Sequence, residues 1–477
     1  MSSPLNKIPV EVSLYEKTEK VYPRETAGRF QSFRTVSMFA LLGLYYILPW
    51  IPWGERQAVL FDLPARKFHI FFLTFWPQDF FFLTLLLILA GLSLFFFTAI
   101  AGRVWCGFAC PQTVWTEAFV RMERWVEGSR AKQMKLTQAP WTFDKVRKRV
   151  TKQVLWITFA LFTGLTFVGY FQPVKELFPA FFSFELGGWA LFWVIFYGFA
   201  TYGNAGFMRE QVCKYMCPYA RFQSAMFDKD TLIVAYDEQR GEPRSRGKRR
   251  KDDETEKAPK GDCIDCGICV QVCPTGIDIR DGLQYECIAC AACIDGCDEV
   301  MKRVGLPVGL IKYSTQAQNQ GNGKSLKQTV LRPRVLIYGT LLAMVFIGFI
   351  SALVMRSSFQ VDILRDRNAL YRWSKTNDIE NSYQVRVMNK SQLDQRYTVA
   401  VRGLEGASAD WGKTSEAGRS RVVQAGDIGE FIVIITLPAT ANYQRSQDIE
   451  LYFSETVGKS PSSIAEESRF WGPAKRN

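Results

Sequence analysis

Long apolar runs alternate with polar segments along the chain, and these runs predict its class. Five of them contain no charged residue, and they lie at 35–53, 80–101, 154–171, 186–208 and 335–355. Each is close to the roughly 17 to 25 residues that cross a bilayer as a helix. The pattern predicts a polytopic α-helical membrane protein with five transmembrane helices. A polar segment of 34 residues precedes the first run, so the sequence does not begin as a secretory signal peptide does.

A different pattern follows the last run. Between residues 356 and 477, apolar and polar residues alternate with the period of a strand, and turn residues separate the alternating stretches. The spacing predicts a small immunoglobulin-like β-sandwich. It contains no His, no Cys and no acidic cluster, so we expect a docking or structural role for it.

Basic residues predict the orientation in the membrane. Segments 1–34, 102–153 and 209–334 hold 6, 11 and 21 Lys and Arg residues, whereas 54–79 and 172–185 hold 3 and 1. Because Lys and Arg of short loops stay on the cytoplasmic side, the amino terminus is expected inside and the carboxyl terminus outside. The net charge of +13 then mainly reflects this topology, and no basic and aromatic patch suggests nucleic-acid binding.

The chain therefore divides into segments of distinct character. We expect a cytoplasmic leader, a four-helix transmembrane core, a flexible linker, a cysteine-rich domain, a tether, a fifth transmembrane helix and an outside domain. Their bounds are 1–34, 35–236, 237–261, 262–312, 313–334, 335–355 and 356–477.

All twelve cysteines fall in the two larger inside segments. Disulfides belong to oxidising compartments, so thiols confined to the reducing side are expected to act as metal ligands or redox groups.

Eight of these cysteines form two runs with nearly the same spacing, each C-x2-C-x2-C-x3-C, in the pattern of a two-cluster bacterial ferredoxin. In that pattern three thiolates of one run hold a [4Fe–4S] cluster, and the fourth crosses to the other cluster. One cluster is therefore assigned to Cys263, Cys266, Cys269 and Cys297, and the second to Cys287, Cys290, Cys293 and Cys273. A pair of Cys₄ zinc sites is the competing interpretation.

The remaining four cysteines form a repeated motif, C-x3-C-P, at the inner ends of the second and fourth apolar runs: Cys106, Cys110, Cys213 and Cys217. Soft thiolates select Cu(I), so these four are candidate catalytic and copper-binding residues. Gly107, Arg103 and Arg209 lie nearby in the sequence, and cationic neighbours favour the thiolate form. The alternative is that the four thiols only pack between helices.

Two other side chains are weaker candidates. His69 is the only histidine, so it cannot supply the paired axial ligands of a membrane haem. It is expected to be an ordinary interfacial residue. Glu117 could carry protons near the inner membrane face, but a solvated helix charge is the simpler expectation.

Several stretches together resemble a known family, the CcoG/FixG/RdxA cytochrome c oxidase accessory proteins. They are 61–69 (FDLPARKFH), 75–79 (FWPQD), 102–107 (GRVWCG), 110–117 (CPQTVWTE) and 287–295 (CIACAACID). The cysteine motifs alone are shared with quinol dehydrogenases of the NapH and NosR type. The loop around His69 and the outside domain are more particular to this family.

The resemblance implies a bacterial inner-membrane protein with its C-terminal domain in the periplasm. Its expected function is to reduce Cu(II) to Cu(I) for assembly of the cbb-type oxidase. The implied cofactors are two [4Fe–4S] clusters, with copper as substrate or bound ion. The implied partners are copper chaperones or oxidase assembly factors, together with an electron donor that the sequence does not identify. Two other functions stay open, a quinol-linked subunit that feeds another reductase and a non-enzymatic copper-handling scaffold.

Overall fold

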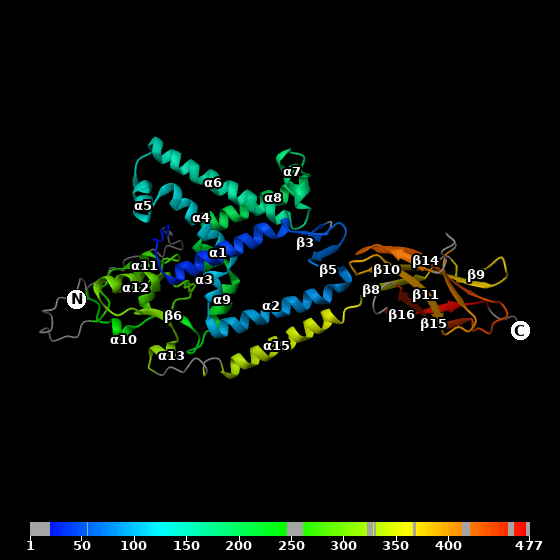
Figure 1. The fold of residues 1–477 in the computed structure, drawn as a ribbon. Coiled ribbons are helices and arrows are strands. Elements are labelled where there is room, and N and C mark those ends of the chain that lie inside the picture. Colours follow the sequence, from blue (N-terminus) through cyan, green and yellow to red (C-terminus); the bar gives the residue numbers. More distant parts are fainter. Residues whose placement is uncertain are drawn as a thin grey trace, which may run out of the picture. The chain divides into compact units, whose positions relative to one another are not determined.

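The computed structural model describes residues 20–54, 56–245, 261–321, 328, 331–365, 369–412, 420–456 and 462–473. The chain divides into two compact units (Figure 1). Unit 1 comprises Met1–Ile51 and Leu87–Met344, and unit 2 comprises Pro52–Leu86 and Val345–Asn477.

Long helices account for the apolar runs. In the described residues, four helical segments are long and apolar enough to cross a membrane: Arg29–Trp50, Pro77–Ala101, Phe143–Val168 and Pro333–Val354. They contain the helices α1 (Arg29–Ile47), α2 (Phe80–Ala101), α6 (Phe143–Val168) and α15 (Pro333–Val354). The run at 186–208 is helical too, but it divides into α8 (Gly188–Thr201) and a π-helical segment, Tyr202–Met208. Five helical runs are thus present, and four of them meet the length and hydropathy expected of a span.

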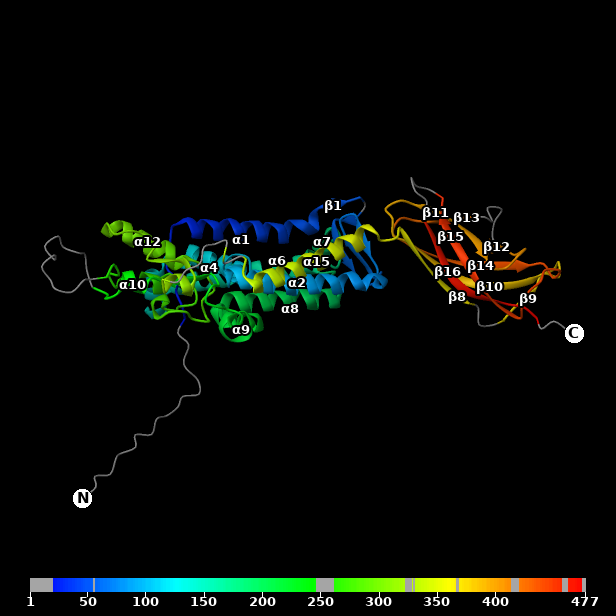
Figure 2. The same cartoon turned by 90° about the horizontal axis from the view of Figure 1, so that it is seen from below.

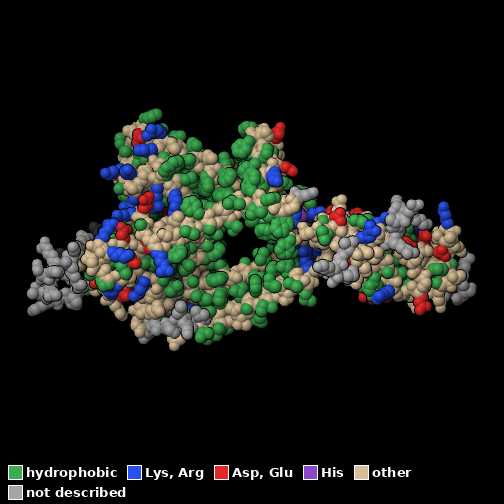
Figure 3. Space-filling view, in the orientation of Figure 1, with side chains coloured by type: hydrophobic (Ala, Val, Ile, Leu, Met, Phe, Trp, Pro, Cys, Tyr) green, Lys and Arg blue, Asp and Glu red, His purple; other side chains and the backbone are tan. Residues whose placement is uncertain are grey.

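Shorter helices follow these runs, and α4 and α5 among them carry many charged residues. Those after α2 are α3 (Val104–Phe108), α4 (Pro111–Glu127) and α5 (Arg130–Gln138), and α7 (Val174–Phe182) follows α6. After α8, a second π-helical segment covers Val212–Met216, and α9 spans Pro218–Ala225. In the space-filling view, hydrophobic side chains cover the long helices of unit 1, whereas Lys and Arg gather around α4, α5 and α12 (Figure 3). This segregation is what a membrane-spanning helix bundle with a polar end requires.

The cysteine-rich part begins earlier in the chain than expected. Strand β6 (Ile233–Tyr236) pairs antiparallel with β7 (Ile311–Ser314), and between them lie α10 (Glu238–Gly241), α11 (Ile268–Gln271) and α12 (Ala292–Val304). The first residues of the expected linker 237–261 include α10, and the backbone N–H of Asp262 donates to Arg240 O at 2.9 Å. Residues 246–260 of that linker lie outside the described residues.

Helix α1 is attached to this part through its amino-terminal end. The backbone N–H groups of Phe30 and Gln31 donate to the carboxylate of Asp295 on α12, at 3.3 and 2.7 Å. A carboxylate at a helix amino terminus satisfies otherwise unpaired N–H groups and complements the helix dipole. The contact ties the first membrane helix to the ferredoxin-like part.

Unit 2 contains a small sheet that the sequence did not predict. Residues 54–79 were expected to be a short loop, but they contain the antiparallel strands β3 (Val59–Asp62), β4 (Lys67–Ile70) and β5 (Leu73–Phe75). Asp79 follows this sheet and accepts from Arg356 at 2.6 Å and from Lys390 at 2.8 Å. These two ion pairs join the sheet to the C-terminal domain within unit 2.

The C-terminal domain is a sandwich of two antiparallel sheets, as predicted (Figure 2). One sheet has the order β12-β14-β10-β8, with β9 paired to β10, and the other has the order β13-β11-β15-β16. Its inward-facing apolar side chains form one core that includes Trp411, Tyr383 and Phe453. The strands are β8 (Phe359–Arg365), β9 (Arg372–Trp373), β10 (Ile379–Asn389), β11 (Gln395–Arg402), β12 (Ser408–Trp411), β13 (Ser420–Val423), β14 (Ile428–Leu437), β15 (Ser446–Glu455) and β16 (Ser463–Trp471).

Candidate functional site

The eight ferredoxin cysteines line two separate cavities in unit 1. One cavity is lined by Cys263, Cys266, Cys269 and Cys297. The other contains Cys273, Cys287, Cys290 and Cys293, with Cys269 at its edge. The fourth cysteine of each run therefore faces the cavity of the other run, which is the crossed arrangement that the spacing predicted.

The placement of these thiols fits clusters better than single ions. In the described part of the chain, no three His, Cys, Asp or Glu side chains converge as the ligands of one metal ion would. A Cys₄ zinc site needs all four sulfurs at about 2.3 Å from one point, whereas each iron of a [4Fe–4S] cluster takes a different cysteine. Four thiols around a cavity fit the cluster, so the zinc alternative is disfavoured.

Polar groups around the two cavities further fit the iron–sulfur assignment. The backbone N–H of Ala289 lies 3.4 Å from Cys287 Sγ, and hydrogen bonds to cluster sulfurs tune the reduction potential. Arg280, which lines the first cavity, is fixed by Asp278 and Asp265, each at 2.7 Å. When bound, the clusters would supply single electrons, and these residues hold the ligand loops in place.

The two C-x3-C-P motifs come together from segments about a hundred residues apart. Cys106 lies in α3, and Cys110 precedes Pro111 at the start of α4. Cys213 lies in the second π-helical segment, and Cys217 precedes α9. The four thiols interact electrostatically with one another, so the structure brings both predicted pairs into one region. Within the described residues, no three of them converge as the ligands of one metal ion would.

This thiol region packs directly against the ligand loop of the second cluster. Cys106, Ile288, Cys290 and Ala292 belong to one buried apolar group, and Cys213 packs on it. The backbone of Gly107 lies against the backbone of this ligand loop, because a Cβ at position 107 would lie 2.8 Å from Cys290 Cα. Only a residue without a side chain allows the two backbones to lie so near each other.

Burial has a larger effect on the pKa of these thiols than their cationic neighbours have. It raises the pKa of Cys106 to about 12 and that of Cys213 to about 11, although Arg103 lowers both. The pKa of Cys110 is raised by burial too. Arg103 thus favours the thiolates as expected, but burial outweighs its effect. A metal must displace the thiol protons when it binds.

The two arginines that were expected to stabilise thiolates have different partners. Arg103 donates to the backbone carbonyls of Tyr285 and Ala220, and it is 4% exposed. Arg209 instead pairs with Glu123 at 2.6 Å. Arg103 therefore ties the first motif to the cluster loop and to α9, while Arg209 belongs to another network.

That network is centred on Glu123, which sequence reasoning missed. Its carboxylate accepts from Lys20 at 2.6 Å, from Lys152 at 3.3 Å and from Arg209 at 2.6 Å. Burial alone would raise the pKa of Glu123, but Arg209 and Lys20 hold it at about 2. The charges come from four separate segments, and no short-range pattern indicates that they meet.

The two weaker candidates, Glu117 and His69, make contacts within the fold. Glu117 is not a solvated helix charge, because its side chain is 12% exposed and pairs with Arg34 at 3.1 Å. His69 lies in β4 of unit 2, where Nδ1 is 3.0 Å from Thr74 Oγ1. Within the described residues, neither side chain lies in a group that could hold a metal ion.

The cysteine-rich and C-terminal parts of the chain each match known protein families. Residues 208–316 match a family described as a 4Fe-4S dicluster domain, and residues 81–129 match one described as a 4Fe-4S binding domain. Residues 349–473 match a family described as the IG-like fold at the C-terminus of FixG. These matches confirm the iron–sulfur prediction and the immunoglobulin-like fold.

Similar proteins cover most of the chain. The nitrogen fixation protein FixG of Rhizobium meliloti is 37% identical over 91% of this chain and 89% of its own length. The proteins RdxB and RdxA of Cereibacter sphaeroides are 43% and 40% identical over 82% of this chain, and over 83% and 84% of their own lengths. A solved structure of a FixG-related protein from Vibrio parahaemolyticus is 24% identical, with a TM-score of 0.21, over 24% of this chain and 97% of that one.

Proposed function

The chain belongs to the FixG and RdxA family of iron–sulfur electron-transfer proteins, and from this premise we propose that it reduces Cu(II) to Cu(I). The proposed site of reduction is the region of Cys106, Cys110, Cys213 and Cys217. The reaction takes up one electron per copper ion, and copper is the substrate.

The observation that carries this proposal is the contact between the thiol region and the second ligand loop. Cys106 and Cys213 pack in the same apolar group as Ile288 and Cys290, and Gly107 lets the backbones approach closely. A copper ion held by these thiols would therefore lie next to the electron-carrying part of the chain. Short separation between donor and acceptor is what single-electron transfer requires of the protein.

The chemistry of the thiols supports selection of the reduced ion. Thiolate ligands prefer Cu(I), while harder oxygen ligands do not. The thiols lie in an apolar region, where Cys106 is 9% exposed, and burial disfavours the more highly charged ion. Both effects shift the equilibrium toward Cu(I).

We further propose that the activity serves assembly of the cbb-type oxidase at the bacterial inner membrane, with copper chaperones or assembly factors as partners. The amino terminus and both cysteine regions are then cytoplasmic, and the sandwich domain is periplasmic, as the Lys and Arg distribution predicts. An alkaline phosphatase fusion after Asn477 should be active, and one within residues 246–260 should be inactive. The reverse result would contradict this orientation.

A Cu(II)-reduction assay tests the proposed activity. The chain is purified anaerobically with its clusters loaded, reduced, freed of reductant and mixed with Cu(II). Cu(I) is then measured with a chelator specific for that ion. A C110S/C217S variant should lose most of the activity while it keeps its iron and its membrane insertion. Quinol oxidation without Cu(II) reduction would instead indicate a quinol-linked subunit of another reductase, and copper binding without turnover would indicate a scaffold.

A second candidate for the thiol region is a further iron–sulfur cluster. It is favoured by the match of residues 81–129, which contain Cys106 and Cys110, to a 4Fe-4S binding family. Iron analysis separates the two, because two clusters give about eight iron atoms per chain and three give about twelve.

A further inference from the structure

A charged cavity of about 540 Å³ lies within unit 1, between the leader, α1, α4 and the second ligand loop. Its volume falls in the range of roughly 300 to 1,000 Å³ that is usual for small-molecule sites. Cys213, Ile288 and Ala292 form part of its wall. Arg24 and Trp125 lie at its exposed side, and the Trp125 side chain is 80% exposed. The cavity is therefore open to a ligand from outside the protein.

The wall carries more positive than negative charge. Arg34, Arg121 and Arg124 surround a single buried carboxylate, Glu117, which lies 3.1 Å from Arg34 and 3.4 Å from Arg121. The pKa of Glu117 stays below its usual value because the three arginines outweigh the effect of burial. The wall also contains Arg24, Arg209, Glu25 and Glu210. Five guanidinium groups against three carboxylates leave an excess positive charge, which attracts anions and repels free Cu(II).

Contacts within the wall hold these arginines in place. Arg121 Nε lies 3.4 Å from Glu117 Oε1, and its Nη2 donates to Thr35 Oγ1 at 2.5 Å. The Arg24 side chain is exposed, and its backbone N–H donates to Gln271 O at 2.8 Å. Arg34 is 7% exposed and fixed by Gln31 and Glu117. A preformed set of arginines around one cavity is suited to phosphate, which guanidinium groups bind through paired hydrogen bonds.

Apolar residues line the rest of the cavity. Val120, Val272, Ile288 and Ala292 contribute to its wall, and Trp125 lies at its edge. A ligand that contacts both kinds of surface has a charged group and an apolar or aromatic body.

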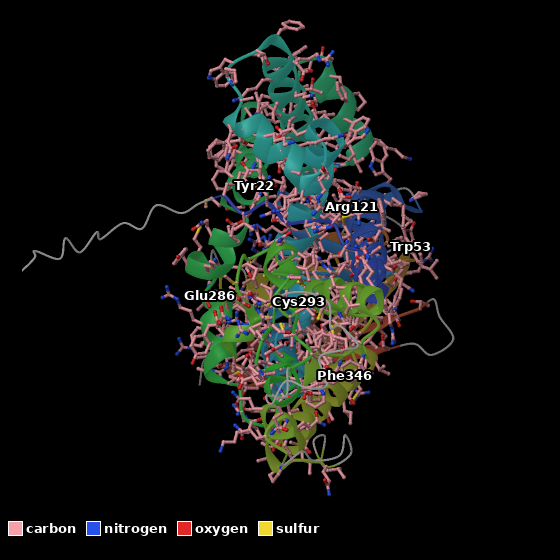
Figure 4. The ribbon with its side chains drawn as sticks, turned by 90° about the vertical axis from the view of Figure 1, so that its left-hand side faces the viewer. Tyr22, Trp53, Arg121, Glu286, Cys293 and Phe346 are labelled. Atoms are coloured by element: carbon pink, nitrogen blue, oxygen red, sulfur yellow. The ribbon has the colours of Figure 1, made fainter. Side chains whose placement is uncertain are left out.

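Figure 4 views this end of unit 1, where Tyr22 of the leader, Arg121 of α4 and Cys293 of α12 are labelled.

We propose that this cavity is a binding site for a phosphate-bearing organic ligand, with the phosphate at Arg24, Arg121 and Arg124 and the apolar body toward Ile288 and Ala292. The ligand would then lie beside the loop of the second cluster. This assignment does not depend on copper chemistry at the thiols. The same phosphate chemistry is offered by a soluble mononucleotide and by an anionic lipid headgroup.

Binding of flavin mononucleotide to the full-length, cluster-loaded chain tests the proposal. Fluorescence quenching in detergent measures the affinity, and inorganic pyrophosphate should compete. R24Q and R121Q should each weaken binding by about tenfold, the loss expected for a charge-assisted hydrogen bond to phosphate. R147Q is the control, because Arg147 lies on the exposed start of α6 and pairs with Asp144 at 3.0 Å. It should bind as the unchanged chain does.

A further variant distinguishes a direct loss of binding in R24Q and R121Q from misfolding of these variants. Glu210 also lines the cavity, so E210Q should tighten binding by removing a negative charge, whereas misfolding would weaken it. The lipid source is tested by mass spectrometry of phosphatidylglycerol retained after delipidation. Retention that falls in R24Q and R121Q but not in R147Q would identify a lipid headgroup as the ligand. The proposal is overturned if neither probe binds, or if the affinities of R24Q, R121Q and E210Q equal that of the unchanged chain.

Discussion

Gly107 of the first C-x3-C-P motif and Cys290 of the second ferredoxin run are in direct backbone contact, so close that a Cβ on Gly107 would meet Cys290 Cα at 2.8 Å. The same Cβ would lie 2.8 Å from Ile288 O and 2.9 Å from Ala289 O. These neighbours are backbone atoms and cannot rotate away. The close approach of the first motif to the second ligand loop at this point thus requires a glycine.

Replacing Gly107 by Ala should separate the thiol region from the cluster loop. The added methyl group forces a backbone shift, with a cost of about 1 to 3 kcal/mol. Cu(II) reduction should fall several-fold while the iron content is unchanged. G43A is the matched control, because a Cβ on Gly43 in α1 meets nothing within 4 Å. Equal Cu(II)-reduction rates for G107A and G43A would show that this contact has no role in electron delivery.

If the fourth cysteine of each run binds the cluster of the other run, substitutions at two cysteines of one run should damage different clusters. Cys263 and Cys273 belong to the same sequence run, but Cys263 lines the first cavity and Cys273 the second. C263S and C273S should each lower the iron content by about four atoms and alter different electron paramagnetic resonance signals. If both variants lose the same signal, each run holds its own cluster and the crossed assignment is wrong.

The buried network around Glu123 should be a major source of stability for unit 1. E123Q removes the charge that Lys20, Lys152 and Arg209 share. Breaking a buried pair typically costs about 3 to 5 kcal/mol, because it leaves uncompensated charge. The thermal unfolding midpoint should therefore drop clearly. E299Q removes an exposed pair with Arg303 on α12 and should change the midpoint little. Similar midpoints for both variants would contradict the importance of the network.

His69 should make unit 2 sensitive to acid. Burial, with Arg56 and Lys67 nearby, lowers the pKa of His69 from 6.5 to about 4. The unfolded chain then takes up a proton below pH 6.5 that the folded chain accepts only near pH 4, so stability is constant above pH 6.5 and falls below it. Hydrogen exchange of residues 67–75 should show weaker protection at pH 5 than at pH 7, and H69N should abolish the difference. Equal protection of the unchanged chain at both values would refute this.

The sequence predicted those features that repeat at short range. The apolar runs, the alternation in the sandwich and the cysteine spacing each depend on neighbouring residues, so they could be recognised without a structure. The ferredoxin spacing also predicts crossed roles for Cys273 and Cys297, and each of them lines the cavity of the other run.

Features that depend on contacts between distant segments could not be predicted. Glu117 and Glu123 have the sequence pattern of solvated charges on an amphipathic helix, and only the fold places Arg34, Lys20 and Arg209 beside them. The raised pKa of Cys106 has the same origin, because burial depends on packing and not on neighbouring letters. The sheet at β3 to β5 was missed since its strands are only 3 or 4 residues long.

Single-turnover Cu(II) reduction by a chain without the four C-x3-C-P thiols tests the central claim most directly. The variant C106S/C110S/C213S/C217S, reduced and freed of reductant, is compared with the unchanged chain at equal iron content. The unchanged chain should form Cu(I) in proportion to the electrons it stores, and the variant should keep its electrons when Cu(II) is added. A variant that reduces Cu(II) as fast and as completely as the unchanged chain would contradict the account and place reduction elsewhere on the protein.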